Sequence, residues 1–510
     1  MSDREGPEES VDVAIVGAGV AGCYLAYRLI SAGGAARLRT VSLHEIADRV
    51  GGRLRSPAVA TLGGERVDLG AMRLDPEVRL IFDLVSHLDL AGDLEPFHDR
   101  RPENLVYVGT SRQRFGQRAG GDPLTVAAER ILPGFDELRR DHSAALKRED
   151  WSVAEAVADE YRDLKEAVRL QGAELKHIDL PTLLRFVMGE SATKSIEAAN
   201  GYSCDRAAGN ASAWLDVLFH GRYDVTYQRL AGGFEQLASR LRHRFERSGG
   251  TVRLGSRLVG IARAAQATRR SGYELLFDDS RDGPRRIVAR HVVLALPQSA
   301  LRTLIAGNPL VRDGRFIAAV EAVRAVPAAK LFLIYPRAWW ADLGIRRGRS
   351  TTDLPLRQTW YPGGDRQQEG PTPLLAAYPT GGSVGYWRRL ARDGSRSVVA
   401  AAQAQLAAMH GLRHVPDPIE SLWHDWSAPP WHGGWHVWRE GAEPDSVIRF
   451  IRRPLGGERI FVASECWSHD HGSVQGAVAA AECVAQDCFG LPWPDWLRRG
   501  GVRLDRKSVV

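Results

Sequence analysis

Residues 11–30 read VDVAIVGAGVAGCYLAYRLI, and this stretch decides the fold. Val11 to Val16 form a mostly apolar run that is typical of a buried strand, and the apolar residues after Gly22 suit a helix. Residues 41–45, VSLHE, indicate a second strand that ends in an acid. A strand, a helix and a strand in this order predict a βαβ unit with parallel strands.

The residues between the first strand and the helix, GAGVAG at 17–22, have the spacing G-x-G-x-x-G, which is informative only in this strand-to-helix context. Gly17 permits the tight turn, Gly19 lets the backbone approach a pyrophosphate, and Gly22 allows close packing of helix on strand. Val20 and Ala21 would place their N–H groups at the positive end of the helix dipole. Glu45, 23 residues after Gly22, could accept hydrogen bonds from a ribose diol. We predict a dinucleotide site, the alternative being a glycine-rich turn that binds no nucleotide.

The rest of the chain divides by pattern. Helical spacing and charge pairs dominate residues 120–230, for example over 153–170 and 196–219. Strand-like runs alternate with Pro and Gly turns over 325–385, which indicates an antiparallel sheet, and 363–370 has the composition of an exposed loop. Further buried strands are predicted at 251–254, 291–297 and 459–464, and further helices over 234–247 and 474–488.

The charge balance argues against a nucleic-acid-binding protein. The chain has 510 residues and a net charge of +6, and its 68 basic residues include only six lysines. The other 62 are arginines, which are spread along the chain and nearly matched by 62 acids. This surplus is a weak footprint for binding a polyanion. We expect no nucleic-acid partner.

Compartment signals are equally plain. Residues 1–10 lack the basic and apolar regions of a secretory signal, and the apolar run 13–27 is too short to span a bilayer. The five cysteines include no C-x-x-C pair, which disfavours a disulfide framework or a thiolate metal site. We expect a cytoplasmic protein with reduced cysteines, no membrane contact and no metal.

Three further motifs carry chemistry. An R-x-G-G-R element spans 49–53, a G-x-M-R element spans 70–73, and Lys330 interrupts the apolar run VPAAKLFLIY at 326–335. A buried ammonium is costly without partners, so Lys330 is either functional or an edge-strand residue whose amine reaches solvent. With Tyr378 before Pro379, Ser464-Glu465 and the glycines of 472–476, these motifs resemble the flavin amine oxidase family, in its L-amino acid oxidase branch and close to its tryptophan-oxidising members.

The resemblance implies a non-covalent FAD, because the position where some members attach the flavin through cysteine is Trp435 here. Arg53 would hold the pyrophosphate and ribose region, Glu465 would meet the ribityl or pyrophosphate region, and the helix after Gly472 would begin near the flavin pyrimidine ring. The cofactor residues carried over are Gly17, Gly19, Val20, Ala21, Gly22, Glu45, Arg53, Gly70, Ala71, Met72, Arg73, Leu258, Glu465, Gly472, Ser473 and Val474.

On the substrate side, the resemblance implies that Arg73 and Tyr378 bind an α-carboxylate and that Lys330 holds a water near flavin N5. These three are the candidate catalytic residues. Tyr202, His220, Ser473 and Trp435 are further candidate substrate-binding residues. Ser473 replaces an aromatic wall residue unless Trp435 or Trp467 takes over that role. Residues 469–471, HDH, are either polar pocket groups or a solvated loop. Tyr378 could also be a core residue at a strand end, and Arg53 part of a solvated basic loop.

The fold class expected from the resemblance is α/β with the amine oxidase architecture. It comprises a Rossmann-like FAD-binding domain (9–72, 231–300 and 445–490), a mixed-sheet substrate domain (73–112 and 301–444) and a helical insertion (113–230). The expected reaction is oxidative deamination of an L-amino acid with dioxygen, giving a 2-oxo acid and hydrogen peroxide, in a homodimeric enzyme. The alternatives are oxidative decarboxylation to an amide, oxidation of amines or polyamines, and a flavin-binding protein without turnover.

Overall fold

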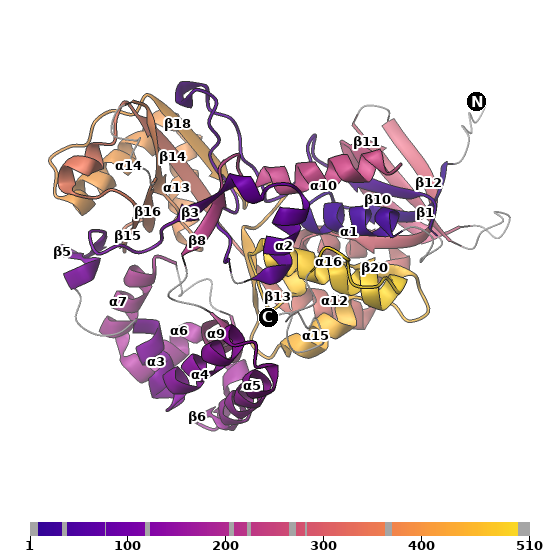
Figure 1. Cartoon of the computed structure of the whole chain (residues 1–510), viewed down its shortest axis with the longest axis horizontal. Helices are drawn as coiled ribbons and strands as arrows, with labels where there is room; N and C mark the ends of the chain where they lie inside the picture. The colour runs from indigo at the N-terminus through magenta and orange to yellow at the C-terminus, as the bar shows by residue number, and fades with distance from the viewer. Residues whose placement is uncertain are drawn as a thin grey trace.

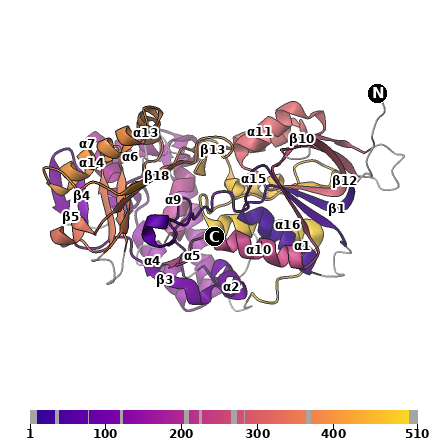
Figure 2. The ribbon, with the colours of Figure 1, turned by 90° about the horizontal axis from the view of Figure 1, so that it is seen from above.

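The structure is a computed structural model, which describes residues 9–32, 38–76, 78–117, 123–202, 209–221, 226–264, 272–280, 283–362 and 370–497. Two sheets and one group of helices build the molecule (Figures 1 and 2). The first sheet and its helices lie at the N-terminal end, and the second sheet lies at the opposite end. The helical group, drawn in purple, lies beside the second sheet in Figure 1.

The first sheet carries the predicted βαβ unit. Strand β1 (Glu9–Val16) pairs in parallel with β2 (Val41–Glu45), and helix α1 (Val20–Ser31) connects them, as predicted. The strand order is β10-β11-β12-β1-β2-β9, and β20 pairs in parallel with β12. The other bounds are β9 (Thr251–Leu254), β10 (Ser256–Arg263), β11 (Tyr273–Asp279), β12 (Gly283–Leu294) and β20 (Ile460–Val462).

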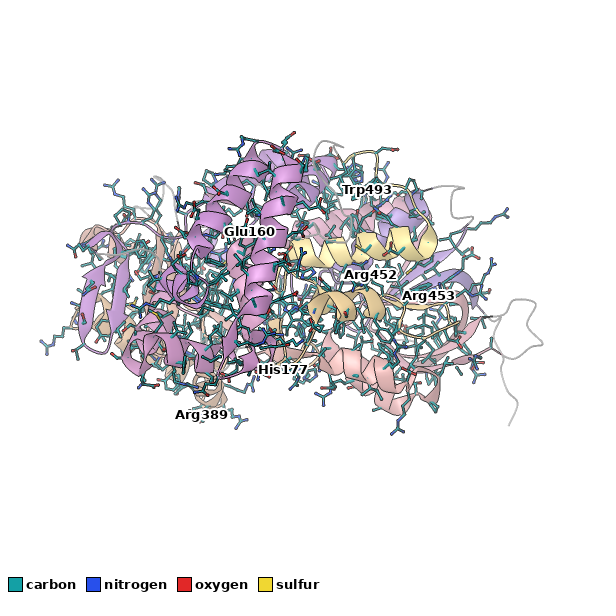
Figure 3. All side chains as sticks on the ribbon, turned by 90° about the horizontal axis from the view of Figure 1, so that it is seen from below. Glu160, His177, Arg389, Arg452, Arg453 and Trp493 are labelled. Atoms are coloured by element: carbon teal, nitrogen blue, oxygen red, sulfur yellow. The ribbon has the colours of Figure 1, made fainter. Side chains whose placement is uncertain are left out.

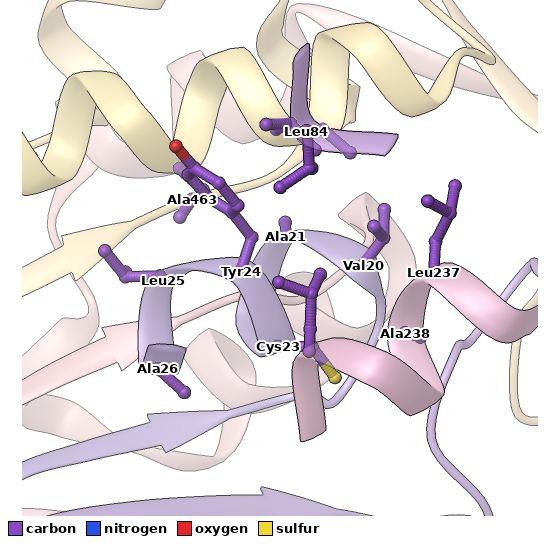
Figure 4. Packing of buried hydrophobic residues seen from close by; sticks show 14 of the residues in the cluster. Val20, Ala21, Cys23, Tyr24, Leu25, Ala26, Leu84, Leu237, Ala238 and Ala463 are labelled. Carbon is purple, nitrogen blue, oxygen red and sulfur yellow. The ribbon is translucent and has the colours of Figure 1, made fainter. Parts of the chain in front are cut away.

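Helices cover both faces of this sheet because β1 is apolar on both. Val13 and Ile15 pack with α1, α2 (Arg79–His87), α10 (Glu235–Arg247) and α16 (Val474–Phe489). Figure 4 shows Cys23 and Tyr24 of α1 among Leu84 of α2, Leu237 of α10 and Ala463, which follows β20. Ala14 and Val16 pack on the other face, in a cluster that draws on α11 (Gln298–Gly307), α12 (Gly314–Glu321) and α15 (Pro444–Ile451). The nucleotide motif therefore sits between two packed layers.

The second sheet confirms the predicted antiparallel region. Its order is β18-β14-β17-β16-β15-β4-β5, and only the pair of β15 with β4 is parallel. Helices α13 (Ser383–Arg392) and α14 (Ser395–His410) pack on it. The strands are β4 (Leu105–Val108), β5 (Ser111–Arg114), β14 (Ala329–Tyr335), β15 (Gly348–Thr352), β16 (Gln358–Tyr361), β17 (Thr372–Ala377) and β18 (Glu420–Asp425).

Two short ribbons connect the parts. Strand β3 (Leu94–Phe97) pairs with β8 (Tyr227–Leu230), and β13 (Val323–Val326) pairs with β19 (Trp435–Trp438), both antiparallel. The chain crosses between the two ends of the molecule along these ribbons. They carry Tyr227 and Trp435 to the region between the sheets.

The helical group comprises α3 (Pro123–Ile131), α4 (Phe135–Lys147), α5 (Trp151–Ala167), α6 (Leu180–Met188), α7 (Glu190–Asn200) and α9 (Ala211–His220). The predicted helix 196–219 is two helices instead. Helix α7 ends because Gly201 adopts a left-handed φ of +78°, and Gly209 lies so close to Trp438 that a Cβ there would be 2.1 Å from its carbonyl oxygen. Most of the predicted loop 363–370 lies outside the described residues.

The basic surplus is scattered. Figure 3 shows Arg389 at one end of the molecule and Arg452 and Arg453 toward the other, so these three arginines do not gather at one place. In the part of the chain that the structure describes, no helix combines the length and the apolarity needed to cross a membrane.

Candidate functional site

The carboxyl end of β1 forms the nucleotide motif. Gly17 has a φ of +102°, and a Cβ built there would lie 2.4 Å from the Ala295 carbonyl oxygen. A Cβ on Gly22 would lie 1.9 Å from the Gly17 oxygen, whereas one on Gly19 would meet no described atom within 4 Å. Gly17 and Gly22 thus serve the packing, and Gly19 borders open space at the N-terminus of α1, where a pyrophosphate would bind.

Replacing Gly22 by alanine is expected to lower the free energy of unfolding by about 3 kcal/mol, because the new methyl group overlaps a backbone carbonyl that cannot rotate away. Urea unfolding of the purified protein measures the change. Gly307→Ala is the matched control, since its Cβ would meet nothing described within 4 Å, and its stability should stay within about 0.5 kcal/mol. Equal stability of the two variants would contradict the close packing of α1.

Glu45 ends β2 beneath the motif. Its carboxylate accepts hydrogen bonds from the backbone N–H groups of Ala18 (2.7 Å) and Ala47 (2.9 Å) and is buried. Gly51 forms a bridge to Gly19, so the R-x-G-G-R loop lies against the glycine turn. The residues expected to meet one dinucleotide therefore converge at one sheet edge.

Arg53, from the same loop, forms an ion pair with Glu465 at the end of β20 and donates to the Gly434 carbonyl (3.2 Å). The second Glu465 oxygen accepts from the Gly472 N–H at 3.2 Å. Arg53 keeps 25% of its side chain exposed although Glu465 beside it is 5% exposed. The arginine therefore faces accessible space from within a buried network and does not belong to a solvated surface loop.

His436, on β19, completes this network, and the sequence analysis missed it. Its Nδ1 lies 3.0 Å from Glu465 Oε1 and its Nε2 lies 3.5 Å from Cys466 Sγ. Burial alone would lower the pKa of His436, but Cys466 and Glu465 outweigh it and raise this pKa to about 9. Three potential metal ligands meet here, yet both ring nitrogens of His436 face acceptors and Arg53 already pairs with Glu465. The three side chains therefore form a hydrogen-bonded network that continues to Arg53.

Replacing His436 by glutamine should change the pH dependence of stability. Because the folded pKa is raised from its ordinary value near 6.5, the stabilisation by the imidazolium is complete below about pH 6.5 and is lost as the pH rises through about 9. The stability advantage of the wild type over the variant should shrink by on the order of 3 kcal/mol across that window. Urea unfolding at pH 6, 7.5 and 9.5 measures it. If the free energies of unfolding of the wild type and the variant change with pH in the same way, His436 does not carry a positive charge in the folded protein.

The N-terminus of α16 corrects one expectation. The Ser473 hydroxyl accepts from the Gly476 N–H (2.8 Å) and donates to the Asp470 carbonyl (2.9 Å). It caps the helix, so its hydroxyl is not free for the substrate contact that we expected. Val474 follows as the first helical residue. Gly472 has a φ of +71°, and a Cβ there would lie 2.8 Å from Trp435 Cβ. Of the two candidate replacements, Trp467 is a core residue, and Trp435 faces the site.

Lys330 lies in β14, between β17 and β18, and is 1% exposed. It is therefore not an edge-strand lysine that reaches solvent. Its Nζ donates to the backbone oxygens of Asp68 (2.9 Å) and Gly70 (2.6 Å) and lies 3.2 Å from Met72 Sδ. A Cβ on Gly70 would lie 1.8 Å from the Arg53 oxygen, so the 70–72 segment packs tightly between the lysine and the R-x-G-G-R loop.

Burial lowers the pKa of Lys330 to about 7, with Arg73 adding to the effect and Asp68 opposing it. The ammonium therefore loses its proton near neutral pH. Two of its donors serve carbonyl groups and a third faces thioether sulfur, which is a weak acceptor. That third donor is the one that could serve a water.

Arg73 follows this segment and is surrounded by rings. Its guanidinium lies 4.4 Å from the Tyr227 ring centroid and 5.3 Å from that of Trp360, and it pairs with Asp99 at 3.0 Å. A quarter of the side chain remains exposed. An always-charged group in such surroundings is suited to bind a carboxylate.

Tyr378, Tyr202 and Trp435 form an aromatic set beside Arg73. The Tyr202 ring lies 6.1 Å from the Tyr378 ring and 5.9 Å from the Trp435 ring, both edge-on, and Lys330 Nζ lies 5.1 Å from the Tyr378 centroid. Burial raises the pKa of Tyr378 above its usual range, and Tyr202 adds to it, so the phenol stays protonated and can donate to an anion. The structure thus brings Arg73, Lys330, Tyr378, Tyr202 and Trp435 together.

The structure does not bring every expected residue to this cluster. The His220 ring packs edge-on against Phe219 and His142 in the helical group, and burial lowers its pKa to about 3. Leu258 lies in β10, opposite Phe277 and packed on the core. His469 Nε2 lies 3.0 Å from Asp445 Oδ1, so part of the 469–471 stretch pairs with helix α15. These positions do not support a substrate role for His220.

Sequence reasoning also missed four residues around Arg73: Asp99, Tyr227, Arg349 and Trp360. No motif marks them, because they come from β8, β15, β16 and a loop that meet only in the folded chain. The lone arginine in the run GRSTT of β15 was the one available signal, and all five residues of this strand are buried.

The geometry fits a dinucleotide-linked flavin. Open space at Gly19, the acid at the end of β2, and the partly exposed Arg53 lie along one edge, and Gly70 and Gly472 continue toward Lys330 and Arg73. The profile of the family described as flavin containing amine oxidoreductase matches residues 20–489. The chain belongs to this family. Its cofactor is accordingly FAD, and it is an oxidoreductase with the amine oxidase fold.

Individual relatives are distant but cover nearly the whole chain. Aplysianin-A of Aplysia kurodai is 24% identical over 96% of this chain and 92% of its own length, and an L-amino-acid oxidase of Echis ocellatus is 23% identical over 93% and 88%. The flavin-dependent L-tryptophan oxidase RebO of Lentzea aerocolonigenes is 26% identical over 92% and 96%. A putrescine oxidase mutant is similar in structure, with a TM-score of 0.65 at 18% identity over 95% of this chain and all of its own. That likeness shows the shared fold.

Proposed function

We propose that this flavoenzyme oxidises L-amino acids at Cα, giving an imino acid that hydrolyses to a 2-oxo acid while dioxygen is reduced to hydrogen peroxide. The observation that carries the proposal is the position of Arg73. Its charged, partly exposed guanidinium lies in a ring of aromatic residues next to the 70–72 segment that Lys330 holds. An amine without a carboxylate gains nothing from such a cation. Relatives named as L-amino-acid oxidases support the same proposal.

Each residue has a definable task. Arg73 binds the substrate carboxylate, and the protonated Tyr378 donates a second hydrogen bond to it, which fixes the orientation of Cα. Tyr202 and Trp435 line the side-chain space and exclude water from it. When bound, FAD supplies the acceptor for the two electrons and the hydrogen removed from Cα. Lys330 holds the Asp68–Gly70 backbone in place, and its contact with the weakly accepting Met72 sulfur is the one that a water could replace.

The experiment is anaerobic mixing of the holoenzyme with each of the twenty L-amino acids and with putrescine, while the flavin absorbance is recorded. Bleaching by one or more L-amino acids and none by putrescine is the expected result. Bleaching by putrescine alone would replace the proposal by amine oxidation. If no compound bleaches the flavin, the chain is not an amino acid oxidase. Aerobic product analysis then separates a 2-oxo acid from the amide that oxidative decarboxylation would give.

A further inference from the structure

Asp99 bridges the partly exposed Arg73 and the buried Arg349. Its Oδ2 lies 3.0 Å from Arg73 Nη1, and its Oδ1 lies 2.8 Å from Arg349 Nε. The Arg349 side chain is 3% exposed, far less than Asp99 (22%) or Arg73 (25%). Arg349 therefore lies behind the carboxylate, and Arg73 lies in front of it, toward the accessible space.

One indole supports both cations. The Trp360 ring centroid lies 5.3 Å from the Arg73 guanidinium and 5.0 Å from that of Arg349, and Trp360 itself is buried. Arg349 also donates to Gln358 Oε1 (3.3 Å) and to the Asn200 carbonyl (3.2 Å). These partners fix its orientation without adding charge. Neutral groups therefore hold Arg349 in place in addition to Asp99.

The charges in this cluster do not cancel. Burial would raise the pKa of Asp99, but Arg349 and then Arg73 outweigh it and lower this pKa, so the carboxylate is ionised. The two arginines in contact with Asp99 stay charged, and Arg100 adds a further positive charge nearby, so the single carboxylate leaves a positive surplus. If Asp99 faced Arg73 alone, it would offset that charge and repel an incoming carboxylate. Arg349 compensates Asp99 from behind, and Arg73 keeps its attraction for an anion.

We propose that Arg349 is a positioning residue that sets the affinity of the site for a substrate carboxylate, by neutralising Asp99 and so leaving the Arg73 charge available. The proposal rests on the proposed function in taking an amino acid carboxylate as the ligand. The positive surplus attracts a carboxylate. The substrate carboxylate is therefore bound beside the aromatic rings of Tyr202 and Trp435.

The test is titration of the holoenzyme with benzoate, a carboxylate that cannot be oxidised at Cα, read as the change in the flavin absorbance spectrum. Arg349→Met removes the compensating charge and should raise the Kd for benzoate by roughly 30-fold. The double variant D99N/R349M removes the opposing charge as well, and its Kd should return to within several-fold of the wild-type value. A purely structural role of Arg349 would give no such recovery, because the double variant is packed no better than the single one.

Arg337→Met is the matched control, since Arg337 forms an exposed pair with Asp342 in the same part of the chain, and its Kd should equal that of the wild type. FAD retention shows that each variant is folded. The proposal is overturned if Arg349→Met leaves the Kd within twofold of the wild type, if the double variant binds no better than the single, or if the wild type does not bind benzoate. The benzoate titration needs no turnover. If the Kd values follow the expected pattern but no amino acid bleaches the flavin, only the proposed function is overturned.

Discussion

Replacing Arg73 by methionine is expected to lower kcat/KM for L-amino acids by on the order of 10²- to 10³-fold, because a buried carboxylate loses its charged partner in both the bound state and the transition state. Methionine keeps much of the side-chain volume, and Asp99 keeps Arg349 as a partner, so the variant should fold and retain FAD. Steady-state oxygen consumption with a good substrate measures the loss. Most of it should appear in KM, since the interaction is already formed in the bound substrate.

A substrate pair isolates the role of the carboxylate. The amine that corresponds to the best amino acid without its carboxyl group is expected to be a poor substrate of the wild type. Arg73→Met should oxidise this amine no more slowly than the wild type does. The exposed Arg337→Met should leave both rates unchanged. An equal loss for the amino acid and for the amine would mean that Arg73 supports the local structure instead of binding the carboxylate.

The sequence was informative for those parts of the site that are encoded by short, continuous motifs. The glycine turn, Glu45, Arg53 and the 70–73 segment lie where the motifs placed them, because each motif is a short stretch with one backbone geometry. Lys330 was found through its contrast with an apolar strand, and burial in β14 explains why that contrast is informative.

The rest of the site depends on long-range contacts. Asp99 and Arg349 are 250 positions apart and meet because β15 brings Arg349 to the same side as Arg73. His436 could be recognised only from the structure, in which β19 places it beside Glu465. The expectation for His220 comes from the resemblance alone, and the structure instead packs its ring against Phe219 and His142 in the helical group. A sequence pattern holds no information on which face of a helix meets a distant strand.

Lys330→Met is expected to change the pH dependence of stability. The folded pKa of Lys330 is lowered to about 7, whereas an unfolded lysine titrates near 10.4. Between these values the unfolded chain binds one proton more at this position than the folded chain does, so the lysine costs stability as the pH falls from about 10 to about 7. The free energy of unfolding of the variant, relative to that of the wild type, should therefore be higher at pH 7 than at pH 10 by on the order of 4 kcal/mol.

The pH profile separates this effect from packing. Losing the hydrogen bonds to the Asp68 and Gly70 carbonyls costs about the same at every pH, so it shifts the whole curve of the variant without tilting it. Urea unfolding of wild type and variant at pH 7, 8, 9 and 10 gives the tilt. Lys194→Met removes an exposed lysine that pairs only with Glu190 on the same helix, and its difference from the wild type should stay within about 0.5 kcal/mol across the range. If the difference in free energy of unfolding between Lys330→Met and the wild type is also independent of pH, the amine keeps its charge in the folded protein. The site would then hold one more positive charge, in addition to the charges of Arg73, Asp99 and Arg349.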